Sequence, residues 1–215
     1  VLCGPGMTTS AGAMQVVSGL LELDVPLILD ADALNCLAKI SIDGIDNNPE
    51  MYRREQPLVM TPHYRELSRL VGGDEVNDLG TAIAAAQKIV WAAGSDNLVV
   101  IAKGPTTAIC GVERVLLPLS GPASLATAGS GDVLAGILAG TLATMRDDMD
   151  RWELLYSYAV AIHSYAGFAA ATEYGEKSVI ATDLIDLIGS AMDLAANDAL
   201  DDLGLTDEGA DSDHE

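Results

Sequence analysis

The sequence predicts an α/β fold in which helices cover both faces of a mostly parallel β-sheet. Short apolar runs bounded by turn residues, such as residues 26–30 and 98–102, are typical of buried strands. Longer segments with apolar residues at helical spacing, such as residues 10–23, alternate with these runs. This alternation favours a parallel sheet covered by helices. The chain has 215 residues, 49% of them apolar, which is enough for one domain with a sizeable core.

The elements follow one another from the N-terminus. The expected strands are residues 26–30, 57–62 and 98–102, followed by a hairpin of residues 106–110 and 114–117 around Gly111. The expected helices are residues 10–23, one opened by residues 32–37 with Asp32 as its cap, then 63–71, 76–93 with Gly94 as its stop, 131–145, 152–171, and 182–195 with Thr182 and Asp183 as its cap. The polar segment 41–56 is expected to be a surface loop.

The domain boundaries follow from composition. Residues 1–196 are predicted to form one domain, and residues 197–215 an acidic, disordered tail without aromatic residues. The first three residues, Val1-Leu2-Cys3, are typical of the end of a strand whose beginning is absent, so we expect the N-terminal strands to be missing from this chain.

Net charge excludes some partners. The formal net charge is −21, and such an acidic surface repels nucleic acid and anionic lipid. No run of 18 apolar residues and no signal peptide is visible, so we expect a cytoplasmic protein that does not bind a membrane. Cys3, Cys36 and Cys110 are widely spaced, which favours buried free thiols over disulfides or a zinc site. The three histidines are also too dispersed to suggest a metal cluster, and no direct protein ligation of a metal is predicted.

The most informative motif is Gly129-Ser130-Gly131-Asp132. Its two glycines let the backbone approach a ligand without a Cβ in the way. The helix that begins there presents unpaired N–H groups and the positive end of its dipole, which form an anion site. Asp132, in the first turn, either caps the helix or faces the substrate as a base. Taken alone, the segment is better explained as a glycine-rich turn with an Asp cap.

A second candidate segment follows the strand expected at residues 98–102. In Lys103-Gly104-Pro105-Thr106-Thr107, the lysine can contact phosphate as a point charge, and a surface hairpin is the alternative.

Acidic residues at element ends are the next candidates. Asp30 and Asp32 lie at a strand end, where carboxylates commonly hold Mg²⁺ on phosphates, although both can instead be helix caps. His63 and Glu66 share one face at a helix start, where a capping box is the alternative.

The order of these motifs is more specific than any one of them. Together they resemble the NAD(P)H-hydrate dehydratase family of the ribokinase-like superfamily, from Val1 to about Ala195. The Gly-Ser-Gly-Asp element indicates only the superfamily, whereas the other elements narrow the resemblance to the dehydratases. The segments that support it are Gly4-Pro5-Gly6, Asp30-Ala31-Asp32-Ala33-Leu34-Asn35, Thr61-Pro62-His63 with Glu66, Lys103-Gly104 with Thr107, and Gly129-Ser130-Gly131-Asp132. The resemblance implies a ribokinase-like three-layer sandwich.

The resemblance also implies an activity. A phosphoryl group would pass from ADP or ATP, with ADP favoured and Mg²⁺ present, to the ring hydroxyl of (S)-NADHX or (S)-NADPHX, the hydrated forms of NADH and NADPH. Phosphate would then leave and restore the ring double bond, which makes the enzyme a hydro-lyase of metabolite repair. A homo-oligomer is expected, and an NAD(P)H-hydrate epimerase is expected as an upstream fusion or as a cooperating enzyme.

Residue roles are carried over in the same way. The resemblance implies that Asp132 takes the hydroxyl proton and that the N–H groups of its turn stabilise the transferring group. It further assigns substrate contacts and nucleotide contacts, to which the acidic residues at element ends add an expected Mg²⁺-phosphate vicinity. The residues of these four sets are Asp132 with Gly129, Ser130 and Gly131; Gly6, His63 and Asp132; Lys103, Gly104, Pro105, Thr106, Thr107 and Gly131; and Asp30, Asp32 and Glu66.

Two alternatives remain at this stage. A ribokinase-superfamily kinase of a small vitamin-precursor alcohol would use the same motifs but leave the phosphate on its product. A non-catalytic nucleotide-binding module would bind nucleotide without turnover.

Overall fold

A computed structural model of the chain describes residues 1–41, 49–144 and 152–202. Within these ranges, strands β1 to β6 form a six-stranded sheet in sequence order. β1 to β4 run parallel, and β5 and β6 add to the β4 edge as an antiparallel hairpin. The strands are β1 (Leu2–Cys3), β2 (Leu27–Leu29), β3 (Leu58–Met60), β4 (Leu98–Ala102), β5 (Ala108–Cys110) and β6 (Val115–Leu116). The predicted mostly parallel sheet is confirmed.

Helices alternate with the parallel strands and then dominate the C-terminal half. They are α1 (Ala11–Leu21), α2 (Ala31–Ile40), α3 (Tyr64–Leu70), α4 (Leu79–Ala93), α5 (Ser130–Thr144), α6 (Trp152–Tyr174), α7 (Ala181–Asp186) and α8 (Ile188–Asp202), with short 3₁₀ helices η2 (Pro49–Tyr52) and η3 (Ala123–Ala126). As predicted, Gly94 ends α4 in the left-handed conformation, with φ of 56°.

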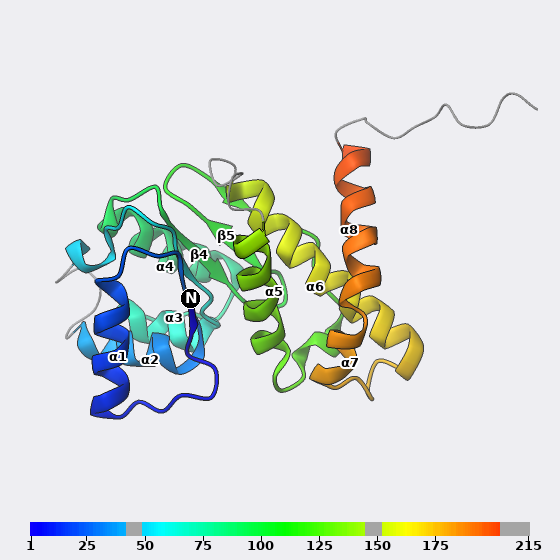
Figure 1. Cartoon of the computed structure of the whole chain (residues 1–215), viewed down its shortest axis with the longest axis horizontal. Coiled ribbons are helices and arrows are strands. Elements are labelled where there is room, and N and C mark those ends of the chain that lie inside the picture. The colour runs from blue at the N-terminus through cyan, green and yellow to red at the C-terminus, as the bar shows by residue number, and fades with distance from the viewer. Residues whose placement is uncertain (42–48, 145–151, 203–215) are drawn as a thin grey trace, which may run out of the picture.

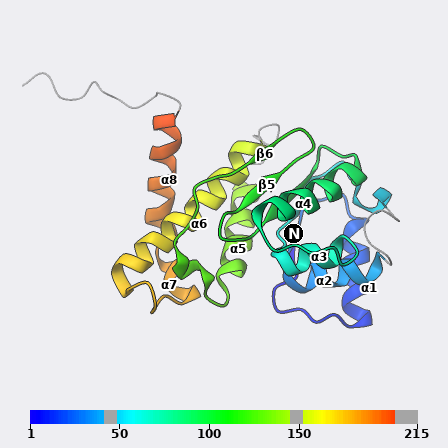
Figure 2. The same ribbon diagram turned by 180° about the vertical axis from the view of Figure 1, so that it is seen from behind.

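The sheet separates two apolar cores, because side chains alternate between its faces. On β2, Leu27 and Leu29 join the core under α1 to α4, whereas Ile28 joins the core under α5 and α6. Figure 1 shows these two helix groups on opposite sides of the sheet. The expected three-layer arrangement, with helices on both faces, is therefore confirmed. Seen from behind, the β5–β6 hairpin lies between α4 and α6, and α8 packs on α6 away from the sheet (Figure 2).

The C-terminal helices differ from the prediction in two respects. The single helix expected at residues 182–195 is divided at Leu187 into α7 and α8. The N-cap of α7 is Ile180, whose N–H donates to Asp183 Oδ2 at 2.9 Å, so Thr182 and Asp183 lie in the first turn and are not the cap. A carboxylate in that turn satisfies an N–H group that has no intrahelical partner.

The predicted boundary at residue 196 falls inside α8, which runs to Asp202. Ala191 and Ala195 are buried against α6. Once packing has fixed the start of a helix, adding further residues to it requires little free energy. The rest of the predicted tail, residues 203–215, lies outside the described residues.

The cap of α2 also differs from the prediction. Asp30 occupies the N-cap position without a side-chain capping bond, and Asp32 lies in the first turn. Asp32 Oδ1 instead accepts from Asn35 Nδ2 at 3.1 Å.

Part of the polar segment 41–56 is not a surface loop. Tyr52 is 1% exposed, and its hydroxyl lies 2.6 Å from Ser41 Oγ. The Arg54 guanidinium donates to the carbonyls of Leu20, Leu21, Leu23 and Val25 at 2.6–3.0 Å, which satisfies the C-terminal end of α1. Residues 42–48 of this segment lie outside the described residues.

The cysteines match their prediction, since Cys3, Cys36 and Cys110 are buried free thiols. None of the helices in the described ranges has both the length and the apolarity needed to cross a bilayer.

Candidate active site

Four parallel strands end at the same edge of the sheet. Their register aligns Cys3 with Leu29, Leu29 with Met60, and Met60 with Val100. The segments that follow these strands begin at Gly4, Asp30, Thr61 and Lys103, and they contain four of the predicted motifs. In an open parallel sheet, this carboxyl edge is where ligands bind.

The Asp30 carboxylate is the most buried acidic group at this edge. It is 1% exposed, and its Oδ1 accepts from Lys103 Nζ at 2.6 Å and from Thr61 Oγ1 at 2.8 Å. Its Oδ2 is buried and has no hydrogen-bond partner in the part of the chain that the structure describes. The three predicted motifs that contain these residues therefore meet through side chains.

The backbone around Asp30 is held tightly. Ala31 has φ of 47°, a left-handed conformation that costs a residue with a Cβ about 1–2 kcal/mol. Gly4, with φ of 130°, lies so close to Asp30 that a Cβ at residue 4 would stand 1.7 Å from the Asp30 carbonyl oxygen. Only glycine allows this approach. The Gly4 carbonyl in turn accepts from the Met7 N–H at 3.0 Å and closes a turn with Gly6, where an added Cβ would meet nothing within 4 Å.

His63 and Lys103 are joined by backbone pairing. They form a parallel bridge, and the Lys103 N–H donates to the Pro62 carbonyl at 2.8 Å. Gly104 follows against α3, where a Cβ would stand 2.4 Å from the Tyr64 hydroxyl oxygen. The lysine loop and the start of α3 are therefore one packed unit.

The capping box considered as an alternative for His63 and Glu66 is present. His63 Nδ1 accepts from the N–H groups of Arg65 and Glu66 at 3.1 and 3.3 Å, and Glu66 Oε2 accepts from the His63 N–H at 2.9 Å. Because Nδ1 accepts, the neutral ring carries its proton on Nε2, which lies 3.4 Å from Glu66 Oε1. Burial raises the pKa of Glu66, while burial and then Lys103 lower the pKa of His63. The structure therefore shows that His63 caps α3. Its contact with the substrate stays a prediction.

The Gly-Ser-Gly-Asp turn opens α5, as predicted. Gly129 has φ of 86°, and its carbonyl accepts a hydrogen bond from the Val133 N–H at 3.1 Å. Gly131 lies beside Lys103, because a Cβ at residue 131 would stand 3.1 Å from Nζ. The side chain of Lys103 therefore connects the strand edge to the start of α5.

Ser130 has a buried partner that sequence reasoning did not single out. His163 of α6 is 8% exposed, and its Nε2 lies 3.0 Å from both Ser130 Oγ and Ser130 O. Burial lowers the pKa of His163 to about 4, so the ring is neutral near pH 7 and fixes the turn by hydrogen bonding. The only signal in the sequence was one imidazole within a long apolar helix, and 33 residues separate it from Ser130.

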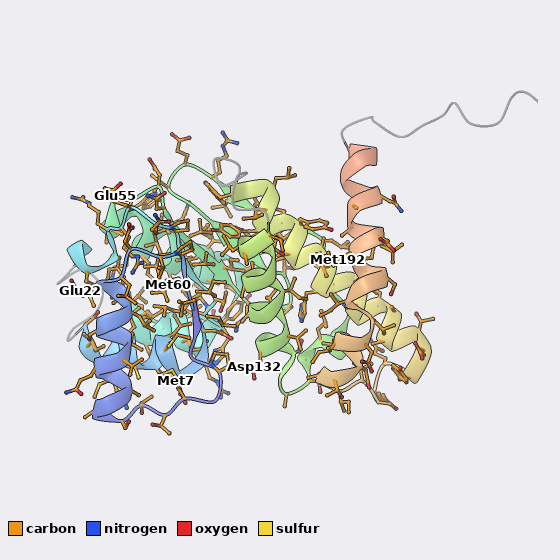
Figure 3. All side chains as sticks on the ribbon, viewed as in Figure 1. Met7, Glu22, Glu55, Met60, Asp132 and Met192 are labelled. Carbon is orange, nitrogen blue, oxygen red and sulfur yellow. The ribbon has the colours of Figure 1, made fainter. Side chains whose placement is uncertain are left out.

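Asp132 is exposed in the first turn of α5, where backbone N–H groups have no intrahelical carbonyl. Figure 3 shows its side chain at the lower end of α5, in the same part of the view as Met7 of the first loop. A carboxylate so placed is accessible to a bound molecule, unlike the enclosed Asp30.

The remaining nucleotide-binding candidates, Pro105, Thr106 and Thr107, lie in the loop between β4 and β5. Ser120 Oγ donates to Thr106 Oγ1 at 3.5 Å, so this loop lies against the segment that precedes η3.

The three acids predicted near Mg²⁺ do not form one cluster. Asp32 and Glu66 accept hydrogen bonds within α2 and at the start of α3, whereas Asp30 alone has a buried oxygen without a partner. Among the described residues, no group of three or more His, Cys, Asp and Glu side chains is arranged to hold a metal ion. The Asp30 Oδ2 atom lacks a partner among the described residues but is buried, so the predicted Mg²⁺-phosphate vicinity of these acids stays a prediction.

This fold, with its ligand edge beside a Gly-Ser-Gly-Asp helix start, defines a ribokinase-like α/β protein. A ribokinase-like superfamily protein from Enterococcus faecalis V583 superimposes with a TM-score of 0.66 and 24% identity, covering 90% of this chain and 62% of that one. At that identity the likeness shows the fold alone.

The family follows from a family model described as NAD(P)H-hydrate dehydratase, which matches residues 1–190. This chain belongs to that family. A bifunctional NAD(P)H-hydrate repair enzyme from Salinibacter ruber is 37% identical over 196 residues, 87% of this chain and 32% of that protein. An ADP/ATP-dependent NAD(P)H-hydrate dehydratase from Bacillus subtilis, co-crystallized with ATP/Mg²⁺ and soaked with CoA, has a TM-score of 0.72 and 28% identity, covering 90% of this chain and 65% of that one. The chain thus spans about a third of the length of the curated relatives it matches.

Proposed function

We propose that this chain dehydrates (S)-NADHX and (S)-NADPHX back to NADH and NADPH at the expense of a nucleotide phosphoryl group. The observation that supports this most is the meeting of Lys103, Gly131 and the exposed Asp132 at one helix start. Membership of the dehydratase family gives the arrangement its substrate class.

The proposed chemistry has two steps. In the first, the ring hydroxyl oxygen forms a bond to the terminal phosphorus of ADP or ATP, the bond to the leaving nucleotide breaks, and Asp132 accepts the hydroxyl proton. In the second, the carbon–oxygen bond of the phosphate ester breaks, phosphate leaves, and the ring double bond returns with loss of a proton. Phosphate is a far better leaving group than hydroxide, which is why phosphoryl transfer assists a dehydration.

The residues of the chain hold the reactants in this proposal. The N–H groups of Gly129, Ser130 and Gly131 stabilise charge on the transferring group. Residues 103–107, with Gly131, hold the nucleotide phosphates, while Gly6 and His63 contact the hydrated dinucleotide. Mg²⁺, when bound to the phosphates, would supply charge neutralisation.

The test is a coupled measurement on the 215-residue chain. Hydrated NADH is incubated with Mg²⁺ and either ADP or ATP, while absorbance in the NADH band and released phosphate are followed. The proposal expects one phosphate for each NADH restored, and faster turnover with ADP. A phosphorylated product that persists would instead identify a kinase, and nucleotide binding without any product would identify a binding module.

Location and assembly complete the proposal. We expect a cytoplasmic homo-oligomer that works with an epimerase, and the similarity to a bifunctional NAD(P)H-hydrate repair enzyme from Salinibacter ruber supports the last point. Exposed apolar side chains on several helices, such as Val16 at 52% and Ile185 at 53%, support self-association. Light scattering of the purified chain measures its mass, and a monomer at all concentrations would contradict the oligomer.

A further inference from the structure

The buried pair of Asp30 and Lys103 has no part in the proton transfer just described. The pair is close, with Oδ1 and Nζ 2.6 Å apart, and the two side chains are 1% and 19% exposed. Buried ion pairs often add little stability compared with apolar side chains of the same volume, because desolvation offsets their attraction. The Asp30 Oδ2 atom also has no hydrogen-bond partner among the described residues, and such a buried oxygen lowers the free energy of unfolding further. Stability alone therefore does not explain the pair.

Asp30 is fixed from several sides. Its N–H donates to the Cys3 carbonyl at 3.0 Å, Gly4 lies against its carbonyl oxygen, and Thr61 donates to its carboxylate. The strained Ala31 follows directly, and such strain persists only where the surroundings hold the backbone in place. The carboxylate is consequently a rigid acceptor.

Lys103 needs such an acceptor. A lysine side chain is a point charge on a flexible stem, and its three N–H donors rotate freely. Asp30 fixes the ammonium group on one side, and Gly131 lies on another, where even a Cβ would come within 3.1 Å of Nζ. The ammonium group is thus held at the turn that opens α5, where the Ser130 N–H donates to the Thr127 carbonyl at 3.3 Å and the first N–H groups of the helix have no intrahelical carbonyl.

We infer that Asp30 is a positioning residue that holds the Lys103 ammonium group against the Gly129–Gly131 turn, so that its charge meets the phosphoryl group. This inference rests on the proposed function and adds to it how the lysine is aimed. Asp30 acts through Lys103 and does not itself touch the nucleotide in this role.

A double-mutant cycle in turnover tests the inference. Asp30→Asn, Lys103→Met and the double variant are compared with the unaltered chain for kcat and for KM of hydrated NADH. Each single change is expected to lower kcat roughly 10- to 100-fold and to change this KM little, since the interaction forms with the transferring group. Because Asp30 acts through Lys103, the double variant should be no slower than Lys103→Met alone. Fully multiplicative effects on kcat would overturn the inference.

A milder pair of variants covers the case in which Asp30→Asn does not fold. Thr61→Ser keeps the hydroxyl that donates to Asp30, whereas Thr61→Val removes it at similar volume. Thr61→Val is expected to lower kcat several-fold, and Thr61→Ser to restore most of it. Equal kcat values for both variants and the unaltered chain would contradict the positioning role.

Calorimetric ADP binding separates the two proposals. An unaltered chain that binds ADP but restores no NADH overturns the proposed function, while weaker ADP binding by Asp30→Asn and Lys103→Met would still support the aimed lysine. An Asp30→Asn variant that folds, binds ADP normally and keeps its kcat overturns the positioning role alone.

Discussion

Two aspartates at the same end of the molecule have opposite surroundings. Asp30, at the end of β2, is 1% exposed and bound by an ammonium group and a hydroxyl. Asp132, in the first turn of α5, is exposed to solvent. Both are carboxylates close to Lys103 or to its neighbour Gly131, so their environments, and not their chemistry, distinguish them.

The comparison shows how one type of side chain can serve two purposes in a site. An enclosed carboxylate that is bonded to an ammonium group and a hydroxyl is suited to fixing a neighbour in place. An exposed carboxylate in the first turn of a helix can meet an incoming hydroxyl, and in the proposed mechanism it accepts the proton of that hydroxyl. Different surroundings for two acidic groups are a common way to separate their roles in enzymes.

The largest effect is expected at the exposed acid. Asp132→Asn removes the proton acceptor and leaves the helix start intact, so kcat should fall about 10²- to 10⁴-fold while ADP binding stays nearly unchanged. Steady-state turnover of hydrated NADH measures the loss.

The matched control is Asp193→Asn, an exposed acid on α8, which is expected to keep the turnover of the unaltered chain. Near-normal turnover of Asp132→Asn would exclude Asp132 as the base.

A smaller effect, on stability, is expected at the turn beside the enclosed acid. Gly4→Ala places a Cβ 1.7 Å from the Asp30 carbonyl oxygen, and it should lower the free energy of unfolding by roughly 3 kcal/mol or more. Gly6→Ala is the control, because Gly6 also has a positive φ, 69°, but an added Cβ meets nothing within 4 Å. It should cost only about 1–2 kcal/mol. Urea denaturation that gives both variants the same stability would show that Gly4 is not constrained by Asp30.

The smallest effect, taken per pH unit, is a pH dependence of stability from His163 behind the Gly-Ser-Gly turn. Its pKa is about 4 in the folded chain and 6.5 in an unfolded one, so between these values only the unfolded chain binds the proton. Stability from this group is therefore complete above pH 6.5 and falls by at most about 1.4 kcal/mol per pH unit as pH drops towards 4.

Urea denaturation at several pH values measures this slope. His163→Gln, which cannot titrate, should have a shallower slope between pH 6.5 and 4 than the unaltered chain. Since the His63 side chain is 48% exposed, His63→Gln should change the slope less. Identical slopes for the His163 variant and the unaltered chain would contradict a buried neutral imidazole.

Most of the fold could be predicted because each element depends on a local pattern. The strand Leu98–Ala102 is a continuous apolar run, and Gly94 stops α4 by its own conformational freedom. Where the prediction failed, distant contacts decided the structure. The Asp30 side chain gives no capping bond to α2 and is bonded instead to Lys103 and Thr61, which follow later strands. Tyr52 is buried against Ser41 in a segment that looked like a polar loop.

The candidate site divides in the same way. The motifs at Lys103, Gly131 and Asp132 were visible because glycines and charged residues stand at strand and helix ends. Their joining through the Asp30–Lys103 pair was not, since 73 residues separate the two. His163 was missed for the same reason, because its partner Ser130 lies on a different helix and nothing near it in sequence suggests a polar contact.

The most direct test of the account is where ADP with Mg²⁺ contacts the chain. Backbone amide resonances of a ¹⁵N-labelled sample report this residue by residue during a titration. We predict that the amides of Gly131 and Asp132 shift strongly and that the amide of Gly94, which precedes β4 at the opposite edge of the sheet, does not. Shifts confined to other parts of the chain, with residues 129–132 unchanged, would contradict it.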